Sequence, residues 1–334
     1  MLVSANTLDD LLREVLQKLL DTPTKVKASR GESREVFGAM LHLTNPRARL
    51  SRSEAKGKLF SALGELFWYL SGDTKLDFID YYIPGRFQVE SDDGERVRSG
   101  YGERLFAHQG INQINNVIQL LRDKRSSRRA VIQLFDASDL AGQYKSIPCT
   151  CTLQFAIRDE KLSLFVSMRS NDAYIGLPHD VFAFTMLQEI VARSVGAELG
   201  EYKHCAGSLH LYDHDTAAAR GYLDEAWQST TTMPAMPAGD PWTAIVDVQS
   251  LETLLRGGTD VDIDSSSLSD YWKDLARLLK AYAASKARNS LLLEKTRDRL
   301  TTDVYKVFIQ ARLDSLKAAQ KGEQPRSGAE VRGE

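Results

Sequence analysis

Two stretches of the sequence are apolar on almost every side and long enough to form helices, so any fold of this chain must bury them. The first covers residues 56–70 (KGKLFSALGELFWYL) and the second covers residues 180–195. Between them, residues 153–157 and 162–168 predict a pair of strands that turns at residues 158–160. The chain therefore combines buried helices with paired strands.

The other periodic segments are shorter. Thr7 stands where an N-cap would stand, ahead of a helix over residues 7–20 whose first turn holds Asp9 and Asp10. Residues 84–100 contain Pro, Gly and many charges, and predict a loop. The sequence also predicts a helix over residues 112–122 and short strands over residues 36–37, 40–43, 130–135 and 209–212.

A Pro-rich segment after residue 235 (MPAMPAGDPW) divides the chain. Beyond it, residues 270–316 predict two or three helices rich in Leu, Lys, Arg and Ala. We therefore expect one domain over residues 1–240, a helical extension over 241–320 and a disordered tail over 321–334.

The composition narrows the classes of partner. The 334 residues are 43% hydrophobic, which is enough for a sizeable core, and the net charge is −2. A net charge so close to zero argues against duplex nucleic acid or a membrane surface as a partner. No apolar run approaches the roughly 20 residues that cross a bilayer, and the N-terminus does not resemble a signal peptide. Three cysteines are too few for a disulfide framework, so we expect a cytoplasmic protein.

Cys149 follows Pro148 near the start of a predicted strand and is the first candidate for chemistry. A free cysteine is usually a small core residue, so a buried thiol is the alternative reading. Arg128-Arg129 upstream and Arg169 downstream favour a nucleophile, because cationic groups stabilise the reactive thiolate. Arginines also bind phosphate with paired hydrogen bonds, although each one alone is more often a surface charge.

Two polar segments lie further along the chain. A Gly-Leu-Pro turn leads into His179 and Asp180, and Asp180 stands where a helix N-cap would stand. His210 and Tyr212 lie two residues apart, so a strand would present both on one face. The cysteines and histidines lack the paired spacing of metal ligands, and no Gly-rich phosphate loop occurs, so we expect no metal.

In their order along the chain, these segments resemble the thymidylate synthase family, which includes pyrimidine nucleotide hydroxymethylases. The resemblance runs from about Arg30 to about Tyr212, more than half of the chain. It implies a mixed α/β (α+β) fold around a large bent mixed sheet with flanking helices, and it makes residues 1–240 the catalytic domain. It also implies a homodimer that packs sheet to sheet, a pyrimidine nucleoside monophosphate as substrate and 5,10-methylenetetrahydrofolate as cosubstrate. The motifs that carry it are ELFWYLSGD (65–73), SRR (127–129), PC (148–149), RSND (169–172), GLP (176–178) and HLY (210–212).

The resemblance assigns the nucleophile and the phosphate ligands residue by residue. Cys149 matches the family nucleophile, and Arg169 and Ser170 match ligands of the substrate phosphate. Arg128-Arg129 match an arginine pair that reaches the phosphate from the other subunit. Arg30 is the candidate for a further phosphate arginine, although its segment is shorter than the usual one.

The remaining roles concern the sugar, the base and water. His210 and Tyr212 match ligands of the sugar 3′-hydroxyl. Glu65 matches the glutamate that organises water and proton transfer. Tyr101 matches a tyrosine near the base, and Asp172 matches an aspartate near the base and the folate.

A thiolate that adds to C6 of a pyrimidine breaks the ring conjugation and makes C5 nucleophilic towards the folate methylene. Which base is used depends on Asp180, since members that use uracil have Asn where this chain has Asp. The carboxyl of Asp180 can accept a hydrogen bond from the 4-amino group of cytosine and share a proton with N3, so we expect dCMP or CMP as substrate. The alternative interpretation is that Asp180 only caps the helix.

Other differences from the residues usual in the thymidylate synthase family concern the product of the reaction. Residues 81–87 (YYIPGRF) contain no Trp, Thr150 replaces the usual His after the nucleophile, and the polar C-terminus does not match the tail that closes over folate. We therefore expect hydration to a 5-hydroxymethyl nucleotide rather than reduction to a methyl group. The alternatives are a thymidylate synthase or dUMP hydroxymethylase, and a non-catalytic homologue that binds a nucleotide or RNA. The C-terminal helices would cover the active-site mouth or extend the dimer interface.

Overall fold

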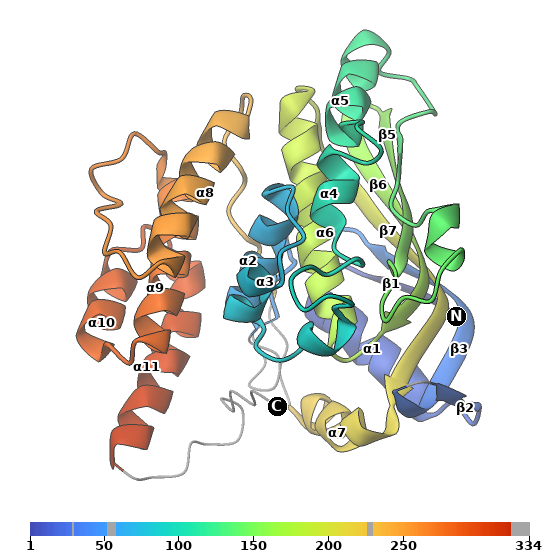
Figure 1. Ribbon diagram of the computed structural model, residues 1–334, viewed down its shortest axis with the longest axis horizontal. Helices are drawn as coiled ribbons and strands as arrows, with labels where there is room; N and C mark the ends of the chain where they lie inside the picture. The colour runs from blue at the N-terminus through green and yellow to red at the C-terminus, as the bar shows by residue number, and fades with distance from the viewer. Residues whose placement is uncertain (29, 52–57, 226–229, 322–334) are drawn as a thin grey trace.

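The computed structural model describes residues 1–28, 30–51, 58–225 and 230–321 (Figure 1). In this part of the chain, one seven-stranded mixed sheet forms the centre, with strand order β1-β3-β7-β6-β5-β4 and β2 paired to β3. The expected mixed α/β architecture, a large mixed sheet flanked by helices, is confirmed. The strands are β1 (Leu2–Ala5), β2 (Lys25–Ala28), β3 (Gly31–Leu43), β4 (Val131–Gln133), β5 (Thr150–Arg158), β6 (Lys161–Asp172) and β7 (Glu198–Tyr212).

The strand pair predicted from the sequence is the β5–β6 hairpin, in which Arg158 pairs with Lys161. Asp159 and Glu160 between them have φ of 47° and 59°, the left-handed backbone that a tight two-residue hairpin turn requires. Buried and half-buried residues alternate along both strands. One face of the sheet is therefore covered and the other is only partly covered.

The helices α1, α2, α4, α5 and α6 lie together on one side of the sheet (Figure 1). The central helix α6 packs against both α2 and the sheet, and almost all of its residues are buried. Its position explains why the sequence keeps it apolar on all sides. The helices before residue 240 are α1 (Leu8–Leu20), α2 (Leu59–Leu70), α3 (Leu76–Tyr82), α4 (Tyr101–Phe106), α5 (Gln113–Asp123), α6 (Gly176–Ser194) and α7 (Thr216–Asp224).

The reading of Asp180 as a helix cap is wrong. The helix α6 begins at Gly176 with Ile175 as its N-cap, so Asp180 lies in the second turn. Pro178 falls in the first turn, where a missing N–H breaks no intrahelical hydrogen bond, and the helix therefore continues through the Gly-Leu-Pro segment. The carboxyl of Asp180 is consequently free for a role other than capping.

Other boundaries also differ from the expectations. Residues 36–37 and 40–43 belong to one strand, β3, which continues through Gly38 at φ 78°. The short strand over 209–212 is the end of β7, which begins at Glu198. Residues 56 and 57 of the first apolar segment lie outside the described residues, as do 322–334 of the predicted tail.

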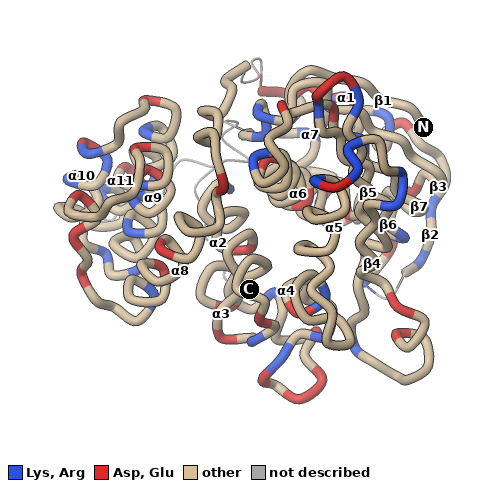
Figure 2. The backbone as a smooth tube through the Cα atoms, turned by 90° about the horizontal axis from the view of Figure 1, so that it is seen from above, with Lys and Arg blue, Asp and Glu red and all other residues tan. Residues whose placement is uncertain are grey.

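After the Pro-rich segment, four helices form in the described chain: α8 (Trp242–Arg256), α9 (Asp270–Lys286), α10 (Ser290–Asp298) and α11 (Lys306–Lys321). They lie on the side of α2 and α3 that faces away from the sheet (Figure 1). Basic and acidic residues are interleaved along them (Figure 2). No helix of the described residues is long and apolar enough to cross a membrane.

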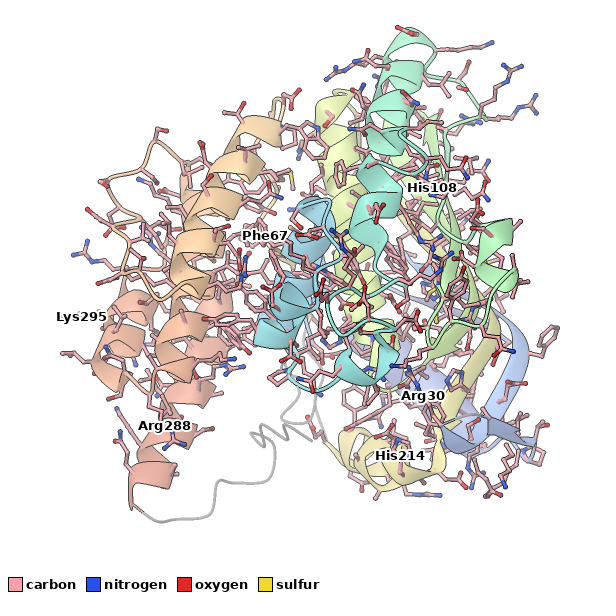
Figure 3. All side chains as sticks on the ribbon, in the orientation of Figure 1. Arg30, Phe67, His108, His214, Arg288 and Lys295 are labelled. Carbon is pink, nitrogen blue, oxygen red and sulfur yellow. The ribbon has the colours of Figure 1, made fainter. Side chains whose placement is uncertain are left out.

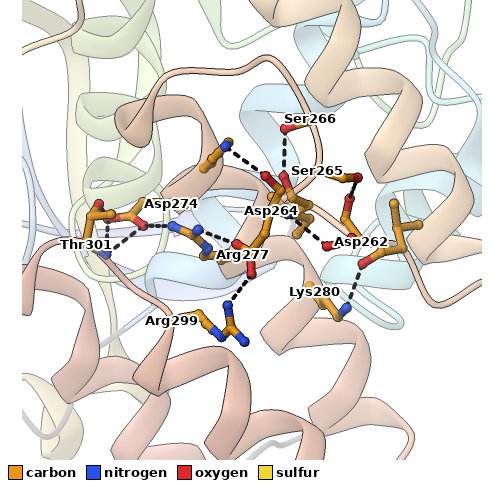
Figure 4. A network of polar contacts seen from close by, with 12 residues as sticks. Asp262, Asp264, Ser265, Ser266, Asp274, Arg277, Lys280, Arg299 and Thr301 are labelled. Atoms are coloured by element: carbon orange, nitrogen blue, oxygen red, sulfur yellow. Dashed lines mark hydrogen bonds and ion pairs between the residues drawn. The ribbon is translucent and has the colours of Figure 1, made fainter.

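A polar network joins the loop before α9 to the helices behind it (Figure 4). Asp264 accepts hydrogen bonds from Arg277 at 2.5 Å and from Arg299 at 2.8 Å. Asp274 accepts from Arg277 at 2.8 Å and from the backbone N–H of Thr301 at 3.0 Å. Asp274 has no exposed surface, so these charge-assisted bonds compensate for its burial.

These C-terminal helices bind the remainder of the chain at α3. The hydroxyl of Tyr282 donates to the carbonyl oxygens of Tyr81 at 2.9 Å and Tyr82 at 3.1 Å. Lys286 donates to the same Tyr81 oxygen at 2.9 Å, and Tyr82 donates to Glu252 at 2.8 Å. In the part of the chain that the structure describes, the extension thus contacts the helical layer and not the partly covered face of the sheet.

Candidate active site

Cys149 lies directly before β5, and its side chain is half-buried between the end of the sheet and the helical layer. Arg169 of β6 fixes the segment that carries Cys149. The guanidinium donates to the carbonyl oxygens of Pro148 at 2.9 Å and Ile147 at 3.1 Å, and the backbone N–H of Arg169 donates to the Cys149 carbonyl at 2.8 Å. The thiol is therefore held at the end of the sheet, on a segment that Arg169 fixes in place.

Several charged groups surround this thiol. Burial raises the pKa of Cys149 above its usual value, and the guanidinium of Arg169 opposes that rise. Asp180 and Glu90 raise the pKa further, and Arg30 lowers it. Arg30, which Figure 3 labels, forms an ion pair with Glu90. The chain thus brings Arg30 and Arg169 to the thiol together with two carboxyl groups.

Glu65 of α2 has a side chain that is 8% exposed and accepts a 2.7 Å hydrogen bond from the hydroxyl of Tyr69. Burial raises the pKa of Glu65 to about 7, and the Tyr69 hydrogen bond only partly opposes it. The ring of Tyr69 lies 5.0 Å from that of Tyr101, whose hydroxyl accepts from the Thr150 hydroxyl at 2.9 Å. A line of side chains therefore connects Glu65 to the residue after Cys149.

Asp180 is half-buried on the second turn of α6. Its Oδ2 accepts a 2.8 Å hydrogen bond from Asn171 Nδ2. Burial raises the pKa of Asp180 well above its usual value, and the negative charge of Glu65 raises it further. The raised pKa of Glu65 lets it carry a proton near neutral pH, and burial favours the protonated form of Asp180 as well; a protonated carboxyl is a hydrogen-bond donor.

The remaining predicted residues lie at the ends of β6 and β7, which run parallel with Ser170 beside Ser208 and Asp172 beside His210. Asp172 accepts a 2.8 Å hydrogen bond from the backbone N–H of Tyr174 and so stabilises the turn that leads into α6. The rings of His210 and Tyr212 lie 4.9 Å apart, on one face of the strand as expected. Burial lowers the pKa of His210 and raises that of Tyr212.

Within one chain, Arg128-Arg129 do not reach this cluster. Val131 pairs with Gln154, so the arginine pair lies seven to eight residues along β5 from Cys149, or roughly 25 Å. Both side chains are exposed, and among the described residues neither guanidinium forms a hydrogen bond or an ion pair. Their predicted contact with a phosphate would therefore have to be made in another subunit.

The structure adds residues that the sequence patterns did not single out. Tyr69 lies four residues after Glu65 on α2, a spacing that brings two side chains together and could have been noticed. Glu90 comes from the loop 84–100, where no periodicity exists to mark it. Among the described residues, no group of three or more His, Cys, Asp or Glu side chains could hold a metal ion.

Comparison with known proteins places this geometry in a family. The chain is 31% identical over 196 residues to the deoxyuridylate hydroxymethyltransferase of Delftia phage PhiW-14. The match covers 54% of this chain and 54% of that protein, so it spans about half the length of the relative. The family model for thymidylate synthase matches residues 8–249, which include Cys149 and all the other candidate site residues. The chain therefore belongs to the thymidylate synthase family.

Proposed function

We propose that this protein transfers a one-carbon unit from 5,10-methylenetetrahydrofolate to C5 of a pyrimidine nucleoside monophosphate and hydrates it to a 5-hydroxymethyl group. The observation that carries the proposal is the placement of Cys149 beside Arg169, with the carboxyl of Asp180 near the thiol and that of Glu65 near Asp180, both of raised pKa. The name of the phage relative supports a hydroxymethyl product.

The thiolate of Cys149 adds to C6, and the electron pair that reaches C5 forms a bond to the methylene carbon while the bond from that carbon to one of its two folate nitrogens breaks. Loss of the C5 proton then breaks the bond to the second folate nitrogen, which releases tetrahydrofolate and gives an exocyclic methylene, to which water adds as the thiolate leaves. The products are the 5-hydroxymethyl nucleotide and tetrahydrofolate, with no change of folate oxidation state. Glu65 would position or deprotonate the water, since a pKa near 7 suits a general base.

The phosphate would be bound at the end of the sheet. Arg169, Ser170 and Arg30 supply donors from one subunit. In a homodimer that packs through the partly covered sheet face, Arg128-Arg129 of the second subunit would complete this site. His210 and Tyr212 would bind the sugar hydroxyl.

Asp180 supports cytosine as the base, because its carboxyl can accept a hydrogen bond from the 4-amino group and share a proton with N3, whereas a carboxylate would face the acceptor O4 of uracil. Cytosine offers an acceptor at N3 and a donor at its 4-amino group, so dCMP or CMP would be the substrate. A second candidate is dUMP, which the name of the phage relative favours.

Product analysis tests this function. The protein is incubated with dCMP, CMP or dUMP, methylenetetrahydrofolate and heavy-oxygen water, and products are identified by mass spectrometry. We expect a cytidylate product whose new hydroxyl carries the heavy oxygen, together with tetrahydrofolate, and no product from Cys149→Ala. A methylated nucleotide with dihydrofolate would instead identify a thymidylate synthase. Absence of turnover with every nucleotide would favour a non-catalytic binding protein.

A further inference from the structure

A chain of buried polar side chains runs from the sheet to Asp180. Tyr202 and His204 of β7 and Asn171 of β6 are 1%, 0% and 4% exposed. The Tyr202 hydroxyl lies 2.9 Å from His204 Nδ1, and His204 Nε2 lies 2.9 Å from Asn171 Oδ1. Asn171 Nδ2 lies 2.8 Å from Asp180 Oδ2. We call Tyr202, His204 and Asn171 the relay.

The chemistry of the three groups fixes the direction of every hydrogen bond in the relay. Burial lowers the pKa of His204 to about 3, so the imidazole is neutral and has one donor and one acceptor nitrogen. The Tyr202 hydroxyl has no other acceptor among the described residues, so its proton is donated to Nδ1 of His204. Nε2 therefore carries the hydrogen and donates to Oδ1 of Asn171, which leaves Nδ2 as the donor to Asp180.

This direction determines what Asp180 can offer to a ligand. Because its Oδ2 already accepts from Asn171, a proton on the carboxyl belongs on Oδ1. A carboxylic acid without such a neighbour could move its proton between the two oxygens and match either base. With the relay in place, the donor is always Oδ1 and the acceptor is always Oδ2.

We propose that the relay is a specificity device: it fixes the order of donor and acceptor on Asp180 so that Oδ1 meets N3 of cytosine and Oδ2 meets the 4-amino group. Uracil presents the opposite pattern, N3–H and O4, and is rejected. This inference rests on the proposed function. Tyr202, His204 and Asn171 are positioning residues, because they act through Asp180 and do not touch the nucleotide.

The test compares matched nucleotide pairs. The ratio of kcat/KM for dCMP over dUMP, and for CMP over UMP, is measured by tritium release from C5 for the wild type, Tyr202→Phe and Asn171→Leu. Tyr202→Phe removes the hydroxyl that fixes the relay. The imidazole of His204 can then change tautomer, and the amide of Asn171 can flip. We expect the ratio to fall at least about tenfold, the effect of losing roughly one hydrogen bond, with kcat/KM for the uridylate unchanged or raised.

Thr185→Val is the matched control, since Thr185 has no exposed surface on the same helix as Asp180 and donates to the Val181 carbonyl of its own helix. Its ratio should equal that of the wild type. Circular dichroism and thermal unfolding establish that each variant is folded, and Tyr202→Phe decides the matter if Asn171→Leu does not fold. Equal losses on both bases in a folded Tyr202→Phe protein would make the relay purely structural and overturn the inference. A wild type that acts on uridylates alone would overturn the cytidylate substrate of the proposed function, before any variant is made.

Discussion

Replacing Glu65 by Gln should change the pH dependence of stability, because the folded protein holds this carboxyl in its protonated form up to a pKa of about 7. In the unfolded chain the carboxyl ionises near its ordinary pKa of 4.5. The raised pKa means that wild-type stability is fully present below about pH 4.5 and declines as the pH rises through 7. A rise from 4.5 to about 7 corresponds to roughly 3 kcal/mol.

Gln cannot ionise and keeps an oxygen that can accept from Tyr69, so Glu65→Gln should lack this decline. We expect the two proteins to be similarly stable near pH 4 and the variant to be more stable by roughly 3 kcal/mol above pH 8. Urea unfolding at closely spaced pH values measures the difference. Glu103→Gln, which removes an exposed carboxyl from α4, is the control and should show a small difference throughout. A Glu65→Gln difference that stays flat or falls with pH would refute the reasoning.

Three further predictions concern the thiol, the core and the dimer. Alkylation of Cys149 by iodoacetamide should accelerate with pH up to values above the usual thiol range, because burial raises its pKa, whereas an ordinary profile would contradict the burial argument. Arg49→Leu should lower the free energy of unfolding by roughly 3–5 kcal/mol, since it leaves the buried Glu189 without its ion pair, and the additional change Glu189→Leu should recover much of this loss in urea titrations. Mixing Cys149→Ala subunits with Arg128→Ala/Arg129→Ala subunits should restore activity, because each mixed dimer has one intact site; inactivity of the mixture, with mixed dimers present, would show that the arginines serve their own subunit.

The sequence predicted those elements whose pattern is local. Thr7 caps α1 through the backbone N–H of Asp10, and the β5–β6 hairpin turns at the expected residues. For the long strand β7, the sequence pattern predicts only the last residues. Glu198, Glu201 and Lys203 interrupt the apolar pattern on a face that is partly exposed. The start of α6 was misplaced because Pro178 resembles a helix breaker although it lies in the first turn.

The candidate site was predictable only in part, for a similar reason. Cys149 and Arg169 could be read from the sequence, because each stands in a motif of adjacent residues. The ion pair of Glu90 with Arg30 joins a loop to a hairpin 60 residues away, and no sequence spacing indicates it. The approach of His204 to Asn171 is likewise not indicated by strand register, which pairs His204 with Val166 and Asn171 with Leu209, so it required the three-dimensional structure.

The most direct test of the central claim is tritium release from C5-labelled dCMP, CMP and dUMP in the presence of methylenetetrahydrofolate, for the wild type and Asp180→Asn. If the carboxyl of Asp180 recognises cytosine, the wild type will release tritium from a cytidylate, and the variant will lose this activity or transfer it to dUMP. Release from dUMP alone by the wild type, with no change of base in the variant, would contradict the account.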